Sequence, residues 1–281
     1  MIEVKLTGGL GNQMFQYAYA KSLQSKGYDV VLDSSIYVSY ILHGGCQLDE
    51  YDISLSVIDK KENRFLQKLK NKLGIKPLNL WEEELLSFDK KHLHPNNGIV
   101  INGYFQSEKY FSKIREVLLH DFSIKRELSF YAKEIEEKIK NSKNSCSIHI
   151  RRGDYISNQE TQKVHGSCDL EYYSIAMEVI ESENQVVNYF IFSDDIVWVK
   201  DNLKIVNAIF VDNNEKRIPH EDIYLMSLCQ NNIIANSSFS WWGAWLNSYH
   251  KKLVVAPKRW FADEKLFLQS QDIVCESWIQ V

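Results

Sequence analysis

The alternation of short apolar runs with amphipathic segments is the feature that most limits how this chain can fold. Strands are expected at 2–6, 29–32, 99–102, 146–150, 186–192, 206–211, 232–235 and 253–256, and helices at 125–143, 170–180, 220–229 and in the tryptophan-rich segment after 235. Strands that alternate with helices are typical of parallel sheets. The sequence therefore predicts an α/β protein, and 281 residues are enough for two domains joined near the charged segment 125–143.

Composition and charge exclude several classes of protein. Hydrophobic residues make up 44% and charged residues 25% of the chain, as in ordinary globular proteins. The net charge of −4 argues against a nucleic-acid partner, which would favour a basic excess. The start has no basic segment followed by an apolar one, and no apolar run reaches about 18 residues, so neither a secretory signal nor a membrane span is predicted. A cytoplasmic protein is expected.

The five cysteines are scattered, odd in number and without a C-x-x-C pair, which is typical of reduced thiols. His165 and Cys168 are close enough in sequence to suggest metal ligands, but two residues make only half a site. No metal is predicted.

Two adjacent arginines stand in the segment His-Ile-Arg-Arg-Gly-Asp-Tyr at 149–155, directly after an apolar strand. The carboxyl end of a strand is where open α/β sheets bind ligands. Two planar guanidinium groups could hold a pyrophosphate through paired hydrogen bonds. The alternative is a strand that simply ends in solvated charges.

Two further segments have the composition of anion sites. Residues 7–18 run from a strand through a three-glycine turn into a helix, although the spacing is not G-x-G-x-x-G. Residues 236–245 open a tryptophan-rich helix with three serines, more than capping alone requires. The alternatives are an ordinary strand-to-helix turn and a capped core helix.

Taken together, the motifs resemble those of the α-1,2-fucosyltransferases, family eleven of the glycosyltransferases. The matching segments are GGLGNQMFQYA at 8–18, HIRRGDY at 149–155, FSDD at 192–195 and NSSFSWWGAWL at 236–246, with weaker matches at 102–106 and 256–257. They occur in order over nearly the whole chain.

The resemblance implies the GT-B fold, in which two Rossmann-like domains face each other across a cleft. Residues 1–140 would form the acceptor-side domain, and residues 141–281 would bind the nucleotide sugar. The implied reaction is inverting and metal-independent, and it moves L-fucose from GDP-β-L-fucose to the 2-hydroxyl of a galactose-terminated glycan in surface polysaccharide or O-antigen synthesis. The donor is a substrate, and no cofactor is implied. The alternatives are another GDP-sugar or acceptor hydroxyl, or an inert nucleotide-sugar-binding protein.

The same resemblance suggests roles for individual residues. Arg151 would contact the leaving β-phosphate, His149 the nucleoside, and Asp222 the guanine edge. Asp194 would contact the nucleotide, or serve only as a turn carboxylate. The remaining expected substrate contacts are Asn12, Gln13, Arg152, Ser237, Ser238, Phe239 and Ser240.

The base that deprotonates the acceptor is harder to assign. Asp154 adjoins the arginines, and Glu160 lies one residue away from the spacing of the catalytic glutamate in core-fucosylating relatives. Of the two, Asp154 is preferred, although it could orient the arginines instead.

Residues 60–76 form a basic segment whose apolar side chains fall on one helical face. Such a helix can lie on an anionic membrane, which would suit a lipid-linked acceptor. The alternative is a solvated helix that packs its apolar stripe on the domain.

Overall fold

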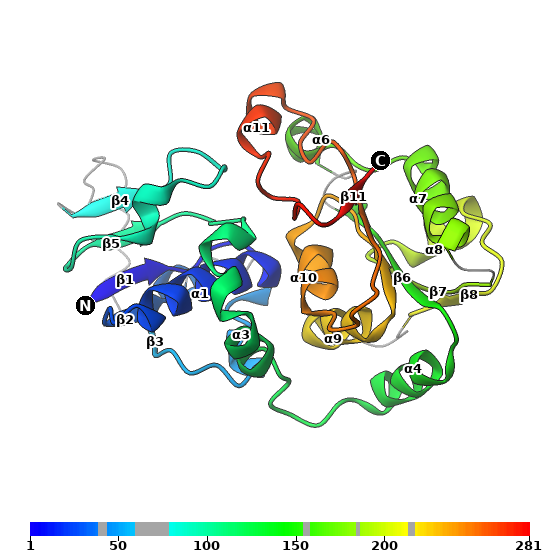
Figure 1. The fold of residues 1–281 in the computed structure, drawn as a ribbon, viewed down its shortest axis with the longest axis horizontal. Coiled ribbons are helices and arrows are strands. Elements are labelled where there is room, and N and C mark those ends of the chain that lie inside the picture. Colours follow the sequence, from blue (N-terminus) through cyan, green and yellow to red (C-terminus); the bar gives the residue numbers. More distant parts are fainter. Residues whose placement is uncertain (39–43, 60–78, 154–157, 184–185, 213–216) are drawn as a thin grey trace. The chain divides into compact units, whose positions relative to one another are not determined.

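The computed structural model describes residues 1–281 apart from 39–43, 60–78, 154–157, 184–185 and 213–216. The chain divides into two compact units, Met1–Lys125 and Arg126–Val281. Each unit contains a parallel sheet with helices beside it (Figure 1). This is the α/β architecture predicted from the alternation of strands and helices.

The first unit has five parallel strands in its described residues, in the order β3-β2-β1-β5-β4. Its elements are β1 (Ile2–Lys5), α1 (Leu10–Ser25), β2 (Val30–Asp33), β3 (Val57–Ile58), β4 (Leu80–Glu82), β5 (Val100–Asn102), α3 (Arg115–Asp121) and the 3₁₀ turns η1 (Ser35–Val38), η3 (Leu48–Glu50), η4 (Lys90–Leu93), η5 (Glu108–Tyr110) and η6 (Ser112–Ile114). Met14, Phe15 and Ala18 of α1 are fully buried. Because α1 is buried nearly all round, it forms the centre of this unit's core.

The second unit has six parallel strands in its described residues, in the order β11-β10-β9-β6-β7-β8. Its strands are β6 (Ser145–Ile150), β7 (Asn188–Ser193), β8 (Ala208–Phe210), β9 (Asn231–Ile233), β10 (Val254–Ala256) and β11 (Ile279–Gln280). Its helices are α4 (Phe130–Asn141), α6 (Gln159–His165), α7 (Leu170–Glu183), α8 (Ile196–Asn202), α9 (Pro219–Leu228), α10 (Ser238–Leu246) and α11 (Glu264–Gln269).

The division between the units falls earlier than residue 140, where the sequence places it. Helix α4 packs on α9 of the second unit. Just before α4, the hydroxyl and the N–H of Ser129 both donate to the Glu221 carboxylate, at 2.7 and 2.6 Å. The charged helix that the sequence treats as a join is therefore part of the second unit.

Strand β6 lies inside the second sheet, and all six of its residues are buried. Ile148 and Ile150 pack in one core cluster with Tyr173 of α7. On the other side, Ser147 accepts a hydrogen bond from the Asn232 amide, which also donates to the Met226 carbonyl of α9. Successive side chains of a strand point to opposite faces. One face of the sheet therefore meets α7, and the other meets α9 and α10.

All eight predicted strands are present, with their ends shifted by a few residues. Strands β3, β4 and β11 were not predicted, because these two or three residues do not stand in apolar runs of the kind that predicted the other strands. The basic segment 60–76, predicted as an amphipathic helix, lies outside the described residues.

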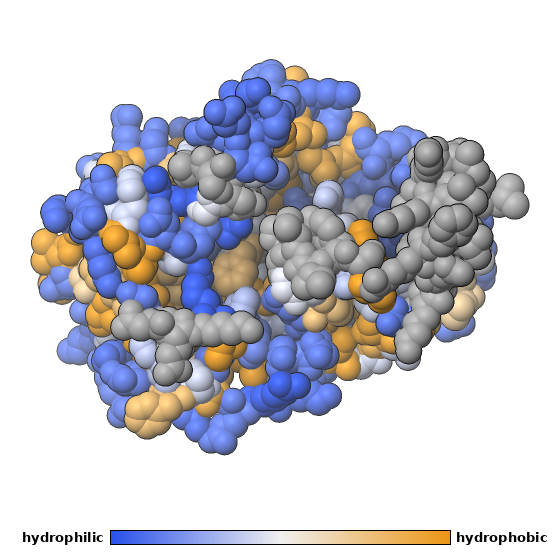
Figure 2. Space-filling view, turned by 180° about the vertical axis from the view of Figure 1, so that it is seen from behind, coloured by the Kyte–Doolittle hydropathy of each residue, from blue (hydrophilic) through white to orange (hydrophobic). Residues whose placement is uncertain are grey.

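The surface view in Figure 2 shows mainly hydrophilic residues, with hydrophobic ones scattered among them. Within the described ranges, none of the helices combines the length and the apolar character needed to cross a bilayer.

Candidate active site

The two adjacent arginines after β6 point to different surroundings. The Arg151 Nη1 atom lies 2.7 Å from Oδ2 of Asp194. The Arg152 guanidinium instead lies 3.4 Å from the ring centroid of Trp198 on α8, and its Nε donates to Asp195 Oδ2 at 3.2 Å. Arg152 is therefore engaged by its own domain through a cation–π contact and an ion pair.

Asp194 lies between the two arginines at the end of β7. Its Oδ1 accepts the backbone N–H of Arg152 at 2.8 Å, while its Oδ2 makes the ion pair with Arg151. A Cβ on Gly153 would stand 2.6 Å from the same Oδ2, so this carboxylate occupies the space that any larger residue would need. The loop after β6 is thus shaped around Asp194.

His149 is a buried, neutral side chain. It is 2% exposed, and its ring lies 5.5 Å from that of Phe239, between centroids. Burial lowers the pKa of His149 well below its usual value, and the nearby Arg217 and Arg151 charges lower it further. Its Nδ1 is buried without a hydrogen-bond partner among the described residues. His149 therefore presents a neutral ring beside Arg151, with one polar atom left to satisfy.

Asp222 stands in the first turn of α9 and is 9% exposed. Its Oδ2 accepts hydrogen bonds from Nε and Nη2 of Arg217, at 3.0 and 2.5 Å. Burial raises the pKa of Asp222, while the Arg217 charge opposes that shift. Arg217 bonds Asp222, and the charges of Arg217 and Arg151 both act on the neutral His149, so these four side chains are called here the β6-end cluster.

The serine-rich motif opens α10 as predicted. Ser237 caps the helix by accepting the N–H of Phe239 at 3.3 Å. Ser238 and Phe239 are partly exposed, whereas Ser240 is fully buried and donates to the carbonyls of Ala235 and Ser237. At the start of the helix, Ser238 and Phe239 are therefore the partly exposed residues, and the Ser240 hydroxyl serves the backbone.

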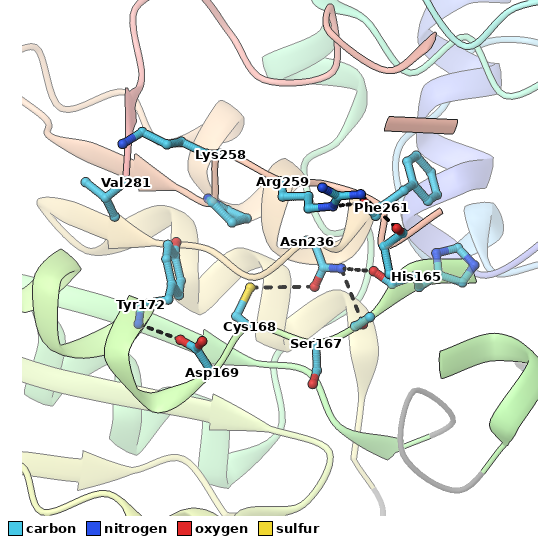
Figure 3. Close-up of a pocket in the computed structure, with 13 residues that line it drawn as sticks. His165, Ser167, Cys168, Asp169, Tyr172, Asn236, Lys258, Arg259, Phe261 and Val281 are labelled. Carbon is cyan, nitrogen blue, oxygen red and sulfur yellow. Dashed lines mark hydrogen bonds between the residues drawn. The ribbon is translucent and has the colours of Figure 1, made fainter. Parts of the chain in front are cut away.

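A pocket of about 330 Å³ lies beyond the carboxyl ends of β9 and β10 (Figure 3). Asn236 connects two segments around this pocket, because its amide donates to the carbonyls of His165 at 2.9 Å and Trp260 at 3.1 Å. The Cys168 Sγ lies 3.6 Å from the Asn236 Oδ1, and burial raises the pKa of that thiol to about 12. In the part of the chain that is described, no three side chains of the metal-binding types are grouped as ligands.

In the first unit, Asn12 is held at the glycine turn. Its Oδ1 accepts a hydrogen bond from Nε2 of Gln106 at 2.8 Å. Gly8 has a φ of +78°, and a Cβ there would collide with the Asn12 amide. This fixes the side chain of Asn12, which is partly exposed.

Gln13 is fully buried and tied to the backbone. Its Nε2 donates to the carbonyls of Gly8 and Gly45, at 3.1 and 2.9 Å, and its Oε1 accepts the N–H of Gln47 at 2.9 Å. These bonds connect the glycine turn to a distant loop. Gln13 therefore stabilises the backbone next to Asn12 from within the core. The sequence instead predicts a substrate contact for Gln13.

Of the two predicted bases, Asp154 lies outside the described residues. Glu160 is the second residue of α6, its side chain is 84% exposed, and its Oε1 is 3.1 Å from Nζ of Lys163. That position gives Glu160 an ordinary surface ion pair.

The sequence reasoning missed three residues that organise these sites: Arg217, Gln106 and Glu83. Glu83 accepts the N–H of Tyr104 and of Phe105, which has a φ of +53°. Gln106 lay inside a weakly matching segment, but no motif pointed to Glu83 or Arg217.

Comparison with known proteins identifies the family of the chain. The family model described as "Glycosyl transferase family 11" matches residues 1–281. An alpha-1,2-colitosyltransferase of Escherichia coli is 38% identical over 100% of this chain and 99% of its own length. The O-antigen biosynthesis glycosyltransferase WbnK of Escherichia coli is 34% identical over 98% of this chain and 99% of its own.

Among solved structures, the NodZ alpha-1,6-fucosyltransferase soaked with GDP-fucose matches with a TM-score of 0.52 at 15% identity, over 87% of this chain and 92% of that one. At that identity, the likeness concerns the fold. Together with the family model, the two parallel sheets and this match define a glycosyltransferase of the GT-B fold, as predicted. The chain belongs to glycosyl transferase family 11, which confirms the resemblance of its motifs.

Proposed function

We propose that this protein transfers L-fucose from GDP-β-L-fucose to the 2-hydroxyl of a galactose residue, with inversion, during surface polysaccharide or O-antigen synthesis. The observation that most supports the proposal is the β6-end cluster, in a chain that matches family 11 along its whole length. Its O-antigen relative WbnK supports the proposed biological setting.

In this reaction the acceptor oxygen attacks the anomeric carbon while the bond to the β-phosphate oxygen breaks. Negative charge then builds on the departing GDP, and a preorganised cation there lowers the barrier. Arg151 is the proposed cation, because it is partly exposed and lies beside the neutral His149. The partly exposed start of α10 adds backbone N–H groups and a favourable helix dipole.

Guanine is the base that Asp222 would select. A carboxylate can accept from both the ring N–H and the exocyclic amine of guanine, and each of its oxygens has two lone pairs. Arg217 donates two hydrogen bonds to Oδ2 of Asp222. Its charge favours the ionised form of the Asp222 carboxylate, although burial disfavours that form.

We assign the acceptor-side contact to Asn12 and the base to Asp154. Asn12 can donate or accept a hydrogen bond but cannot take up a proton, so another side chain must act as the base, and Asp154 is the one we propose. Turnover of Asp154→Asn should fall much further than that of Glu160→Gln, whose side chain is exposed and paired with Lys163. Equal losses would remove the assignment.

The donor sugar needs its own test, because the colitosyltransferase of Escherichia coli is 38% identical to this chain. Colitose lacks the 3-hydroxyl that fucose carries. A site that hydrogen-bonds that hydroxyl rejects the deoxy sugar by about 10⁴-fold or more, whereas a site that merely leaves room for it discriminates weakly.

The deciding experiment gives the purified protein GDP-fucose and GDP-colitose in parallel, each with a panel of β-galactosides, and identifies the product linkage. A fucosylated galactoside with an α-1,2 bond is the expected product. Preferred use of GDP-colitose would identify the alternative donor. GDP binding without turnover of either donor on any acceptor would identify an inert binder.

Activity should persist in excess EDTA if Arg151 supplies the positive charge. Complete loss of activity, restored by added manganese, would contradict the proposed leaving-group site.

A further inference from the structure

We infer that Asp194 is a positioning residue, which sets the place of the Arg151 guanidinium for transfer without itself contacting the donor. This inference rests on the proposed function of Arg151. It differs from the sequence expectation, in which Asp194 touches the nucleotide.

Both oxygens of Asp194 face its own domain. Oδ1 accepts the Arg152 N–H at 2.8 Å, which pins the backbone directly after Arg151. Oδ2 lies 2.7 Å from Arg151 Nη1 in an ion pair, although it is not aligned as a hydrogen bond. The side chain of Asp194 is only 16% exposed, less than the 28% of Arg151. The guanidinium is thus the more accessible member of the pair.

Gly153 provides independent support. Its φ is not in the left-handed region, so backbone strain does not require a glycine there. What excludes a side chain is the Asp194 Oδ2 atom, 2.6 Å from the position of a Cβ. Three successive residues of the loop, Arg151, Arg152 and Gly153, therefore contact or closely approach this carboxylate.

The neighbouring Asp195 offers a matched control. Its Oδ2 pairs with Arg152, and its Oδ1 caps α8 by accepting the Trp198 N–H at 3.2 Å. Asparagine is also a good N-cap, so Asp195→Asn preserves that function. The control variant also removes one carboxylate charge, but from the residue that pairs with Arg152 and not from the one that pairs with Arg151.

The test compares Asp194→Asn with Asp195→Asn in turnover and in calorimetric affinity for GDP. In Asp194→Asn the site loses a negative charge and keeps an acceptor for the Arg152 N–H. GDP affinity should therefore stay within about threefold or rise, while kcat falls by about 10- to 100-fold because the cation is misplaced. Asp195→Asn should stay within about threefold of wild type in both measurements.

Two further variants test whether Asp194 acts by positioning Arg151. Gly153→Ala should reproduce the fall in kcat, because its Cβ must displace Asp194. In an Arg151→Lys background, Asp194→Asn should cost much less, since the group being positioned is gone. Unchanged kcat in Asp194→Asn, a parallel loss of GDP affinity, or losses that multiply in the double variant would each overturn the inference. Failure of wild-type protein to bind GDP or transfer sugar would instead contradict the proposed function.

Discussion

Arg151 and Arg152 are neighbours in sequence with opposite surroundings, although both carry the same charged group. Arg152 is packed on the Trp198 ring and paired with Asp195, whereas Arg151 lies near the buried His149 ring. An extended backbone places successive side chains on opposite sides. The Arg152 side chain therefore serves the fold, whereas Arg151 is the arginine that we propose for the donor phosphate.

The two arginines should respond differently to replacement by lysine. Arg151→Lys keeps the charge but loses the planar group, so GDP-fucose should bind tolerably while turnover falls by about 100- to 1,000-fold. Arg152→Lys should be milder for turnover and should instead reduce thermal stability, through loss of the Trp198 contact. Steady-state kinetics with GDP-fucose and thermal melts of both variants would check this. A larger kinetic loss in Arg152→Lys would mean that the roles are reversed.

Asp222→Asn tests whether the buried carboxylate reads guanine. Losing a charged acceptor should weaken GDP binding by about 1.5–3 kcal/mol. The variant also weakens the contact with Arg217, so thermal melts must accompany calorimetry. Comparison with IDP, which lacks the exocyclic amine, gives a specific readout. Wild type should prefer GDP, and the variant should lose part of that preference; unchanged GDP affinity would remove Asp222 from the nucleotide site.

The residue-level site was partly readable from the sequence. The motifs singled out Arg151 and Asp194, which directly follow β6 and β7, and His149, which lies inside β6 two residues before Arg151; the structure joins Arg151 and Asp194 in an ion pair. It did not reveal that Gln13 and Ser240 are fully buried, since polar residues in a ligand-like motif can equally satisfy backbone groups. Arg217 was missed because it lies in no matching motif, and because its influence on His149, far away in the sequence, depends on the fold.

At the scale of elements, the tryptophan-rich helix α10 is a core helix that opens at the candidate site. Trp241 and Trp242 are fully buried, while Ser238 and Phe239 at its start are partly exposed. Its packing on α9 is close: a Cβ on Gly243 would stand 2.8 Å from the Met226 Cβ. The position of the helix start thus depends on a glycine about one turn further along.

Gly243→Ala should therefore destabilise the protein, even though alanine favours helices. Overpacking of a well-filled core typically costs about 1–3 kcal/mol, and the Met226 Cβ next to α10 cannot move without its backbone. Urea unfolding would measure the loss. Ser174→Ala, at an exposed position in the middle of α7, is a control for helix propensity and should change stability little. Equal behaviour of the two variants would show that α9 and α10 have room to separate.

At the scale of the whole molecule, each unit contains, among its described residues, one histidine that is buried in neutral form. His149 lies in the second unit and His92 in the first, and burial lowers both pKa values. His92 is 1% exposed, with its ring near those of Trp81 and Phe105 at 4.6 and 5.5 Å between centroids. Neither ring nitrogen of His92 has a hydrogen-bond partner among the described residues. Protonating such a ring requires it to leave the core or the core to open.

The stability of the protein should therefore fall as the pH drops through the histidine range. The unfolded chain takes up these protons below about pH 6.5, whereas the folded state resists them because its histidine pKa values are lowered. The unfolded state then binds more protons, so this contribution is complete above the unfolded pKa and is lost as the pH falls below it. His92→Phe keeps an aromatic ring in the same pocket and removes the titration. Urea midpoints at about pH 7.5 and about pH 5.5 should differ less in His92→Phe than in wild type. An unchanged difference would mean that His92 does not contribute to the acid sensitivity of the fold.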